Sequence, residues 1–450
     1  MRYVWEKMKI HFVGIGGISM SALAKLMLLW GHKVSGSDKV YSKNAIELVE
    51  WGAKVYLGCD RQAIDESNLV VYTASILDAD EELTYAKSIG KMMMSRECFL
   101  RELSLEYDMT VAVSGSHGKT TVTSMLSDIF YEAGLNYTAH IGGHSSKGNM
   151  VYRGRDIFLT EACEYNRSFL SLNPDVALVL NTDFDHPDTY KNLGEINKAF
   201  CSFCNLVKRG GTIVANKDSE FYDIIKCTHK NMCTYSIESS ATFQATNIIN
   251  YANGYYGFQI MESGYPNMDI KLKVAGLHNV SNALGAYATA VRCGVDRVVI
   301  RRALENFQGV RGRMELLGER GGAKVMRDYA HHPTEIRSLL KVAREQCYGR
   351  LIVVFQPHTM LRTEALLDEF KDALMGADKV FLLKEYTARV ESGGKSAFDL
   401  YDMLRGKMEC YYYATPLELY SAIIPTLKVG DMVLLTGAGD IQESYNLLLN

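Results

Sequence analysis

The stretch SGSHGKTTVTS, in the first third of the chain, combines the residue types that hold a nucleotide phosphate. Glycines let backbone N–H groups turn toward phosphate oxygens, a lysine reaches the outer phosphates, and the hydroxyl after it can bind Mg²⁺. Gly115, Gly118, Lys119 and Thr120 fit these roles. The eight-residue Walker A pattern also requires a glycine where Val113 stands, so the motif is a shortened G-x-x-G-K-T.

Acidic residues and a histidine follow two later strands of the same region. Glu161 ends the run DIFLTE, and NTDFDHPD (181–188) follows VALVL. Oxygen ligands of this kind suit Mg²⁺ beside a phosphate. His186 is a softer ligand than magnesium usually takes, so on chemistry alone it is equally well a residue that caps a turn.

A second glycine motif lies near the N-terminus. Gly14, Gly16 and Gly17 follow an apolar run, Ser19 stands where a third fingerprint glycine would be, and Asp38 ends the next strand. The pattern suggests a dinucleotide or the diphosphate of a nucleotide sugar. The alternative is a tight turn that needs glycine only for packing.

The last third of the chain offers three polar segments that each follow an apolar run: RDYAHHPTE (327–335), QPHTMLRTE (356–364) and TGAGDI (436–441). A histidine pair beside an aspartate could accept or orient a proton, and Arg362 could grip a carboxylate with two hydrogen bonds. Taken singly, each is more typical of a structural histidine or a surface arginine than of a site. Their common position after strands favours a site.

Short β-branched runs alternate with helical stretches along most of the chain, which predicts parallel α/β sheets with ligands at the carboxyl ends of the strands. Around residues 231–275 a polar, tyrosine-rich segment is expected to be antiparallel instead. The boundaries that we expect are 1–107, 108–311 and 312–450. The strands expected first are 9–14, 33–38, 54–58 and 68–73; later ones lie in MTVAVSG, DIFLTEA, VALVLN, GTIVAN, AKVMRDYA, RLIVVF, KVFLL and DMVLLTG.

Length and composition agree with three domains. The chain has 450 residues, of which 47% are hydrophobic and 22% charged, and its net charge of −3 gives no reason to expect nucleic acid or a membrane surface as a partner. No run of eighteen apolar residues predicts a membrane span. Residues 1–24 superficially resemble a signal peptide, but three glycines inside the apolar run favour a strand, a turn and a helix. We therefore expect a cytoplasmic protein.

Ten cysteines are too few for a disulfide scaffold in a chain of this length. Cys201 and Cys204, with Cys227, His229 and Cys233 downstream, could be counted as a zinc site. The helical periodicity of INKAFCSFCNLVK favours packing of both cysteines on a buried face instead.

The motifs in this order resemble the Mur ligase family over essentially the whole chain, and within it the branch that adds L-alanine. The short phosphate loop is shared with folylpolyglutamate synthetases, whereas DYAHHPTE with QPH is specific. The resemblance implies a Rossmann-like N-terminal domain, a P-loop ATPase-like central domain and a Rossmann-like C-terminal domain. The motifs that carry it are GIGGISMSALA, GSD, GSHGKTT, EACEY, DHPD, HNVSNA, GVRGR, DYAHHP, QPHTMLRT and GAGDI.

What the resemblance implies is an amide-forming ligase of peptidoglycan precursor synthesis. ATP would phosphorylate the lactyl carboxylate of UDP-N-acetylmuramate, and the amine of L-alanine would attack the acyl phosphate. Mg²⁺, or Mn²⁺ in its place, would assist, and no nucleic acid, membrane or obligate protein partner is implied. A ligase that recycles murein peptides, an NAD(P)-dependent oxidoreductase and a P-loop ATPase switch remain as alternatives.

The resemblance also implies a role for individual residues. Lys119, His186, His331 and Arg362 would be catalytic, and Thr120, Glu161 and His186 would bind metal. The nucleotide would contact Gly115, Ser116, His117, Gly118, Lys119, Thr120, Thr121, Asn279, Arg313 and Asp328; the other substrates would contact Gly14, Gly16, Gly17, Ile18, Asp38, His331 and Arg362.

Three positions depart from the family pattern. Arg327 stands where an acidic residue commonly precedes DYAHHP, Gly312 interrupts a commonly basic run, and TMLRT lacks the aromatic residue often found before its arginine. None of these removes a residue to which chemistry is assigned.

Overall fold

The computed structural model describes residues 7–73, 76, 79–226, 228–229, 232–387 and 393–449. The chain folds into two compact units. The first unit contains Met1–Thr182, Ile196–Thr242 and Gly285–Leu304, and the second contains Asp183–Glu195, Phe243–Leu284 and Glu305–Asn450. Each unit is described by itself below.

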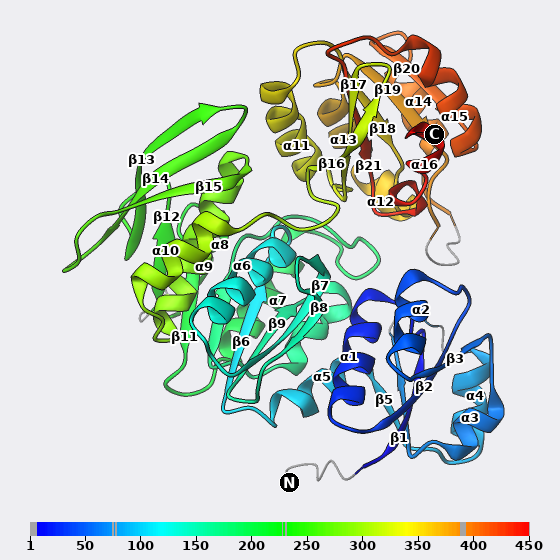
Figure 1. Ribbon diagram of the computed structural model, residues 1–450, viewed down its shortest axis with the longest axis vertical. Coiled ribbons are helices and arrows are strands. Elements are labelled where there is room, and N and C mark those ends of the chain that lie inside the picture. The colour runs from blue at the N-terminus through cyan, green and yellow to red at the C-terminus, as the bar shows by residue number, and fades with distance from the viewer. Residues whose placement is uncertain are drawn as a thin grey trace. The chain divides into compact units, whose positions relative to one another are not determined.

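The first sheet of the first unit is parallel, with the strand order β3-β2-β1-β4-β5. Its core includes Ile10, Phe12, Leu23 and Phe99, all fully buried. Blue ribbon in Figure 1 marks this sheet and its helices. The bounds are β1 Lys9–Val13, α1 Ile18–Leu29, β2 Lys33–Asp38, α2 Lys43–Glu50, β3 Lys54–Leu57, α3 Arg61–Glu66, β4 Leu69–Tyr72, α4 Glu81–Ser88, β5 Met93–Ser95 and α5 Arg96–Ser104.

The strand, turn and helix expected at the start of this sheet are confirmed. Residues 9–13 form its central strand, and the helix behind them buries Met20 to Met27. Residues 1–6 of this segment lie outside the described residues.

The other strands of the first unit follow the order β12-β11-β10-β6-β9-β7-β8, parallel from β12 to β7, with β8 antiparallel to β7. The phosphate-loop strand β6 therefore lies between β10 and β9. The bounds are β6 Met109–Ser114, α6 Lys119–Glu132, β7 Tyr137–Ser145, β8 Gly148–Tyr152, β9 Ile157–Ala162, η1 Tyr165–Ser171, β10 Val176–Val179, β11 Thr212–Asn216, α8 Glu220–Ile225 and β12 Cys233–Ser236. Both units contribute residues to the helices α7 Leu193–Asn205, α9 Leu277–Arg292 and α10 Arg297–Asn306.

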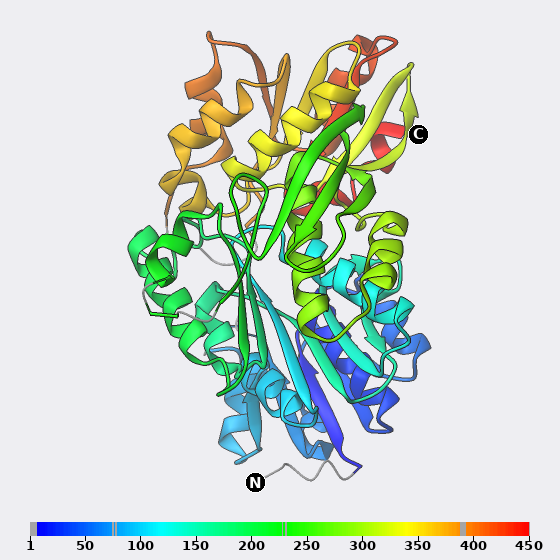
Figure 2. The ribbon, with the colours of Figure 1, turned by 90° about the vertical axis from the view of Figure 1, so that its left-hand side faces the viewer.

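The second unit holds an antiparallel layer, β13 Phe243–Ala252, β14 Tyr255–Glu262 and β15 Met268–Ala275, which confirms most of the antiparallel segment expected around 231–275. The expectation is wrong for β12, which is parallel to β11. Figures 1 and 2 show the long strands β13, β14 and β15 in green. The second unit also holds a sheet of order β16-β17-β21-β18-β19-β20, parallel except for β16. The bounds are β16 Glu315–Arg320, β17 Ala323–Asp328, α11 Pro333–Gln346, β18 Leu351–Phe355, α12 Met360–Ala365, α13 Leu367–Leu374, β19 Lys379–Leu383, α14 Ala397–Leu404, β20 Glu409–Tyr413, α15 Pro416–Ile423, η2 Ile424–Thr426, β21 Met432–Thr436, η3 Asp440–Gln442 and α16 Asn446–Leu449.

The α/β class is confirmed. None of the helices in the described part of the chain is both long and apolar enough to cross a membrane. Cys201 and Cys204 both lie on α7, where Cys204 is buried and Cys201 half-buried. Neither joins a cluster of potential metal ligands among the described residues, and Cys227 lies outside them.

Candidate active site

The phosphate loop connects β6 to α6, the setting that the motif requires. Gly118 has φ +86°, a left-handed conformation that favours glycine, and it is the N-cap of α6. Val122 N–H donates to Gly118 O and closes the first helical turn. The four N–H groups before Val122 have no acceptor within the helix, so this end of α6 is suited to bind an anion.

Asn181 fixes the shape of this loop. Its backbone carbonyl accepts from Ser116 N–H over 3.1 Å, and its Oδ1 accepts from His117 N–H over 2.9 Å. In return, Asn181 Nδ2 donates to His117 O over 3.2 Å. The N–H groups of Ser116 and His117 already donate to Asn181. The N–H groups from Gly118 to Thr121 are therefore the ones that can donate to a phosphate.

Lys119 is bound inside the loop. Its Nζ lies 2.8 Å and 3.0 Å from the two carboxylate oxygens of Glu164, and it also donates to Gly115 O and Ser116 O. Burial disfavours the lysine cation, but the Glu164 carboxylate more than offsets this and raises the pKa of Lys119 above its usual range. The ammonium is therefore charged at neutral pH, and Glu164 is its counterion.

Thr120 and Glu161 meet at the carboxyl edge of the sheet. Thr120 Oγ1 lies 3.2 Å from Glu161 Oε2, and the other carboxylate oxygen accepts from Gly142 N–H over 2.6 Å. A hydroxyl beside a carboxylate at a phosphate loop is the oxygen donor set that Mg²⁺ prefers, so these residues fit that ion. His186 belongs to the second unit.

The N-terminal glycine loop is arranged around Asp38. Gly16 N–H donates to Asp38 Oδ2 over 2.8 Å, and a Cβ at Gly16 would come within 2.9 Å of that oxygen and 2.6 Å of Ser42 Oγ. Gly14 turns the chain with φ +82°, and Gly17 is the N-cap of α1, which begins at Ile18. All five predicted residues of this loop thus lie together at one sheet edge.

In the second unit, two adjacent histidines are held by hydrogen bonds to backbone groups. His331 Nδ1 lies 2.9 Å from Tyr329 O, and because a carbonyl can only accept, Nδ1 carries the proton. By the same argument His332 Nε2 donates to Phe184 O over 3.0 Å, while its Nδ1 accepts from Thr334 N–H. Burial lowers the pKa of His331 to about 4, so its Nε2 presents an unprotonated lone pair at neutral pH.

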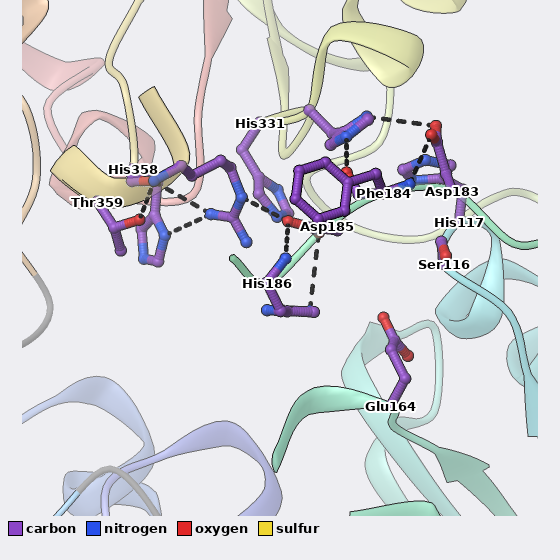
Figure 3. Close-up of polar contacts among 12 residues, drawn as sticks. Ser116, His117, Glu164, Asp183, Phe184, Asp185, His186, His331, His358 and Thr359 are labelled. Atoms are coloured by element: carbon purple, nitrogen blue, oxygen red, sulfur yellow. Dashed lines mark hydrogen bonds and ion pairs between the residues drawn. The ribbon is translucent and has the colours of Figure 1, made fainter. Parts of the chain in front are cut away.

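Arg362 is buried and ion-paired. Its Nε lies 2.7 Å from Asp185 Oδ1, and its Nη1 lies 3.0 Å from His358 Nδ1. Figure 3 shows the Asp185 carboxylate among His186, His331 and His358. Although burial opposes ionisation, the Arg362 guanidinium holds the pKa of Asp185 well below its usual range. The alternative that Arg362 is a solvated surface residue is therefore wrong.

His186 lies beside this pair. Its backbone has φ +56°, unusual for a residue with a side chain, and its N–H donates to Asp185 Oδ1 over 2.7 Å. The side-chain Nε2 is 3.7 Å from Asp185 Oδ2. Thr189 and Tyr190 both donate their N–H groups to His186 O, so the turn is fixed on both sides.

The predicted nucleotide residues of the second unit are Asp328, Arg313 and Asn279. Asp328 accepts from Met314 N–H and Ala330 N–H, both over 2.8 Å, and Arg313 Nη1 lies 3.9 Å from its Oδ1. Burial raises the pKa of Asp328. Asn279, in the first turn of α9, donates to Ala275 O over 2.7 Å.

Four residues with a direct role in this geometry were not singled out from the sequence: Asn181, Glu164, Asp185 and His332. All four lie within the motifs EACEY, NTDFDHPD and DYAHHP. Only the fold shows which backbone or charged group each one contacts.

Comparison with known proteins agrees with the motifs. Three family models match the chain: "Mur ligase family, catalytic domain" over residues 9–108, "Mur ligase middle domain" over 113–290, and "Mur ligase, glutamate ligase domain" over 312–439.

Whole-chain relatives and a solved structure agree with these models. A UDP-N-acetylmuramate–L-alanine ligase of Acetivibrio thermocellus is 39% identical, covering 98% of this chain and 95% of its own, and one of Clostridium tetani is 38% identical, covering 98% of both. The crystal structure of the UDP-N-acetylmuramate–alanine ligase MurC from Thermotoga maritima matches with a TM-score of 0.84 and 27% identity, over 98% of both chains. The chain, with its short phosphate loop and its histidine pair, belongs to the Mur ligase family.

Proposed function

We propose that this Mur ligase uses ATP to join L-alanine to the lactyl carboxylate of UDP-N-acetylmuramate, in the cytoplasm, as a step of peptidoglycan precursor synthesis. One observation carries the reaction type: a lysine, a hydroxyl and a carboxylate converge on the N-terminus of α6. The substrates rest on the whole-chain relatives, which are named for this activity at 37–39% identity.

The reaction proceeds in two steps. A lactyl carboxylate oxygen attacks the γ-phosphorus of ATP, the bond to the bridging oxygen breaks, and ADP leaves with that electron pair. The amine of L-alanine then attacks the acyl carbon, inorganic phosphate leaves, and the amine loses a proton as the amide forms. Because a free carboxylate is a poor acyl donor, the first step makes the second feasible.

At the phosphate loop, the N–H groups of Gly118 to Thr121 and the ammonium of Lys119 would hold the outer phosphates and offset the charge that develops during transfer. Gly115, Ser116 and His117 would shape the loop around them. Lys119 would exchange its bonds to Glu164 for bonds to phosphate when the nucleotide binds.

Thr120, Glu161 and His186 would hold Mg²⁺, or Mn²⁺, which would neutralise phosphate charge. Asn279 would contact the adenine, and Arg313 and Asp328 the remainder of the nucleotide. Gly14, Gly16, Gly17, Ile18 and Asp38 would bind the UDP part of the sugar nucleotide.

His331 and Arg362 would receive L-alanine. The neutral His331 has an unprotonated Nε2 that can accept a hydrogen bond from the amine and orient it. The Arg362 guanidinium would bind the amino-acid carboxylate. Each of the three expected domains would bind one substrate. Segment 1–107 would bind the sugar nucleotide, segment 108–311 would bind ATP, and segment 312–450 would bind the amino acid.

The test is phosphate release measured with a panel of amino acids and peptides, with and without UDP-N-acetylmuramate. We expect release only when ATP, the sugar nucleotide and L-alanine are all present, with a product heavier by one alanyl residue. Faster turnover with a preformed peptide would favour the recycling ligase. Release that is independent of any amino acid would favour an ATPase switch.

A further inference from the structure

Arg96 occupies a position at which a ligand is expected. It begins α5 directly after β5, which is parallel to β4 in the first sheet. It therefore lies at the same carboxyl edge as the loop Gly14–Gly17 and Asp38, where α/β sheets bind ligands. A cation in the first turn of a helix is also unfavourable toward the helix dipole, so local structure does not explain an arginine there.

The hydrogen bonds of the Arg96 guanidinium go to two neutral hydroxyls. Nη1 lies 3.3 Å from Ser19 Oγ, and Nη2 lies 3.4 Å from Ser168 Oγ. No carboxylate in the described ranges of the chain forms an ion pair with Arg96, although its side chain is half-buried. A partly desolvated charge without a counterion is costly, and such positions are typically kept to bind an anion.

His140, which forms a hydrogen bond with Ser19, supplies no negative charge either. Ser19 Oγ lies 2.9 Å from His140 Nε2, and His140 Nδ1 lies 3.0 Å from Thr160 Oγ1. Burial, together with the nearby Arg96 charge, lowers the pKa of His140 to about 3, so the imidazole is neutral. The chain from Arg96 to Thr160 therefore carries one net positive charge.

The two hydroxyls lie on elements close to the two loops that the substrate must connect. Ser19 lies in the first turn of α1, immediately after the glycine loop. Ser168 donates to Cys163 O, the residue before Glu164, which is the counterion of Lys119. All of these residues are in the first unit. Arg96 thus contacts one residue that directly follows the sugar-nucleotide loop and one that is bonded to the segment carrying the counterion of Lys119.

We propose that Arg96 binds the lactyl carboxylate of the sugar nucleotide and holds it for attack on ATP, an inference that rests on the proposed function. The carboxylate is the group that has to lie between the diphosphate and the γ-phosphate of ATP. A positive charge at this point reduces the repulsion between the two anions as they approach. The serine hydroxyls keep the guanidinium in place without neutralising it.

Calorimetric titration of the full chain with two ligands tests the assignment. UDP-N-acetylmuramate carries the carboxylate, whereas UDP-N-acetylglucosamine has the same diphosphate and no lactyl group. We expect Arg96→Gln to weaken binding of the first about tenfold or more, as loss of a charged hydrogen bond does, and to leave binding of the second nearly unchanged. Arg96→Lys should recover part of the loss.

Arg101→Gln is the matched control, because Arg101 is an exposed arginine on the same helix. It should bind both ligands like the parent. Equal weakening of both ligands by Arg96→Gln would assign Arg96 to the diphosphate and overturn the proposal, as would parental affinity for both. The parent reports separately on the proposed function: if it does not bind UDP-N-acetylmuramate, the function fails whatever Arg96 does.

Discussion

Arg362 and Asp185 form an ion pair of 2.7 Å in which both side chains are almost completely buried. The guanidinium also contacts His358, through Nδ1 and through the backbone carbonyl. A buried pair of this kind is costly unless its geometry is well satisfied, and its loss on one side leaves an uncompensated charge. If Arg362 receives the carboxylate of L-alanine, that carboxylate has to compete with Asp185 or share the guanidinium with it.

This competition gives a prediction for Arg362→Lys. Lysine keeps the charge but cannot make two parallel hydrogen bonds, so the KM for L-alanine should rise about tenfold or more while the KM for ATP changes little. Arg362→Ala should be more severe and should also lower the melting temperature, because Asp185 loses its counterion. Steady-state kinetics at saturating ATP and UDP-N-acetylmuramate measure the effect. Unchanged alanine KM values in Arg362→Lys would remove this residue from the site.

Lys119→Ala separates phosphate transfer from sugar-nucleotide binding. The lysine is placed at the phosphate loop, whereas Asp38 and the glycine loop form their own edge of another sheet. We expect kcat to fall at least a hundredfold, the range found when a preorganised charged donor is removed. Binding of UDP-N-acetylmuramate, followed by calorimetry, should remain within a few-fold of the parent. A folded variant that no longer binds the sugar nucleotide would contradict this division.

Glu164→Gln tests whether the carboxylate holds Lys119 back from the phosphates. Removal of a negative charge beside the loop frees the ammonium and lessens repulsion of the nucleotide, so the Kd for ADP without metal should fall several-fold. The pKa of Lys119 should also fall, since Glu164 is what raises it. Weaker ADP binding in the variant would mean that Glu164 positions the lysine productively. Glu106→Gln, on a residue with no assigned role in the loop, serves as the control.

How far the sequence predicts this protein depends on the range of the interactions involved. The apolar run KVFLL predicts the strand 379–383 to the residue, because burial in a parallel sheet determines it locally. The strand 33–38 was also predicted to the residue, although KVSGSD is mostly polar, from its place in the alternation of strands and helices. The short or polar strands β5, β7, β8, β12, β16 and β20 were not predicted. Their residues pair with neighbours that are distant in the sequence, and their composition is typical of loops as well.

The same distinction applies to the site. Motif spacing predicts which loop binds phosphate, since glycine, lysine and threonine act within a few residues of one another. It does not predict that Asp185 pairs with Arg362, 177 residues away, or that Glu164 binds Lys119 from the end of another strand. Arg327, which stands where the family commonly has an acidic residue, also has a partner that motif spacing does not predict. Its Nε lies 2.9 Å from a carboxylate oxygen of Glu315 on the adjacent strand β16.

His140 provides a prediction about stability and pH. Its pKa is lowered from an ordinary 6.5 to about 3 in the folded chain, mainly by burial, so between these values the unfolded chain binds a proton that the folded one does not. The contribution of His140 to the free energy of unfolding is therefore fully present above pH 6.5 and is lost as the pH falls toward 3. The expected loss from this one group is on the order of 3 kcal/mol at pH 4.

His140→Gln keeps a hydrogen-bonding side chain between Ser19 and Thr160 but cannot titrate. A comparison with the parent therefore separates the pH-dependent stability that His140 contributes from that of the other buried histidines. The variant should be less stable than the parent at pH 8, and the difference should shrink by about 3 kcal/mol as the pH is lowered to 4. Urea unfolding followed by tryptophan fluorescence is the appropriate measurement, because Trp30 and Trp51 belong to the unit that contains His140. Parallel pH profiles for parent and variant would show that the imidazole is protonated equally in both states, and would contradict the neutral link between Ser19 and Thr160 on which the uncompensated charge of Arg96 depends.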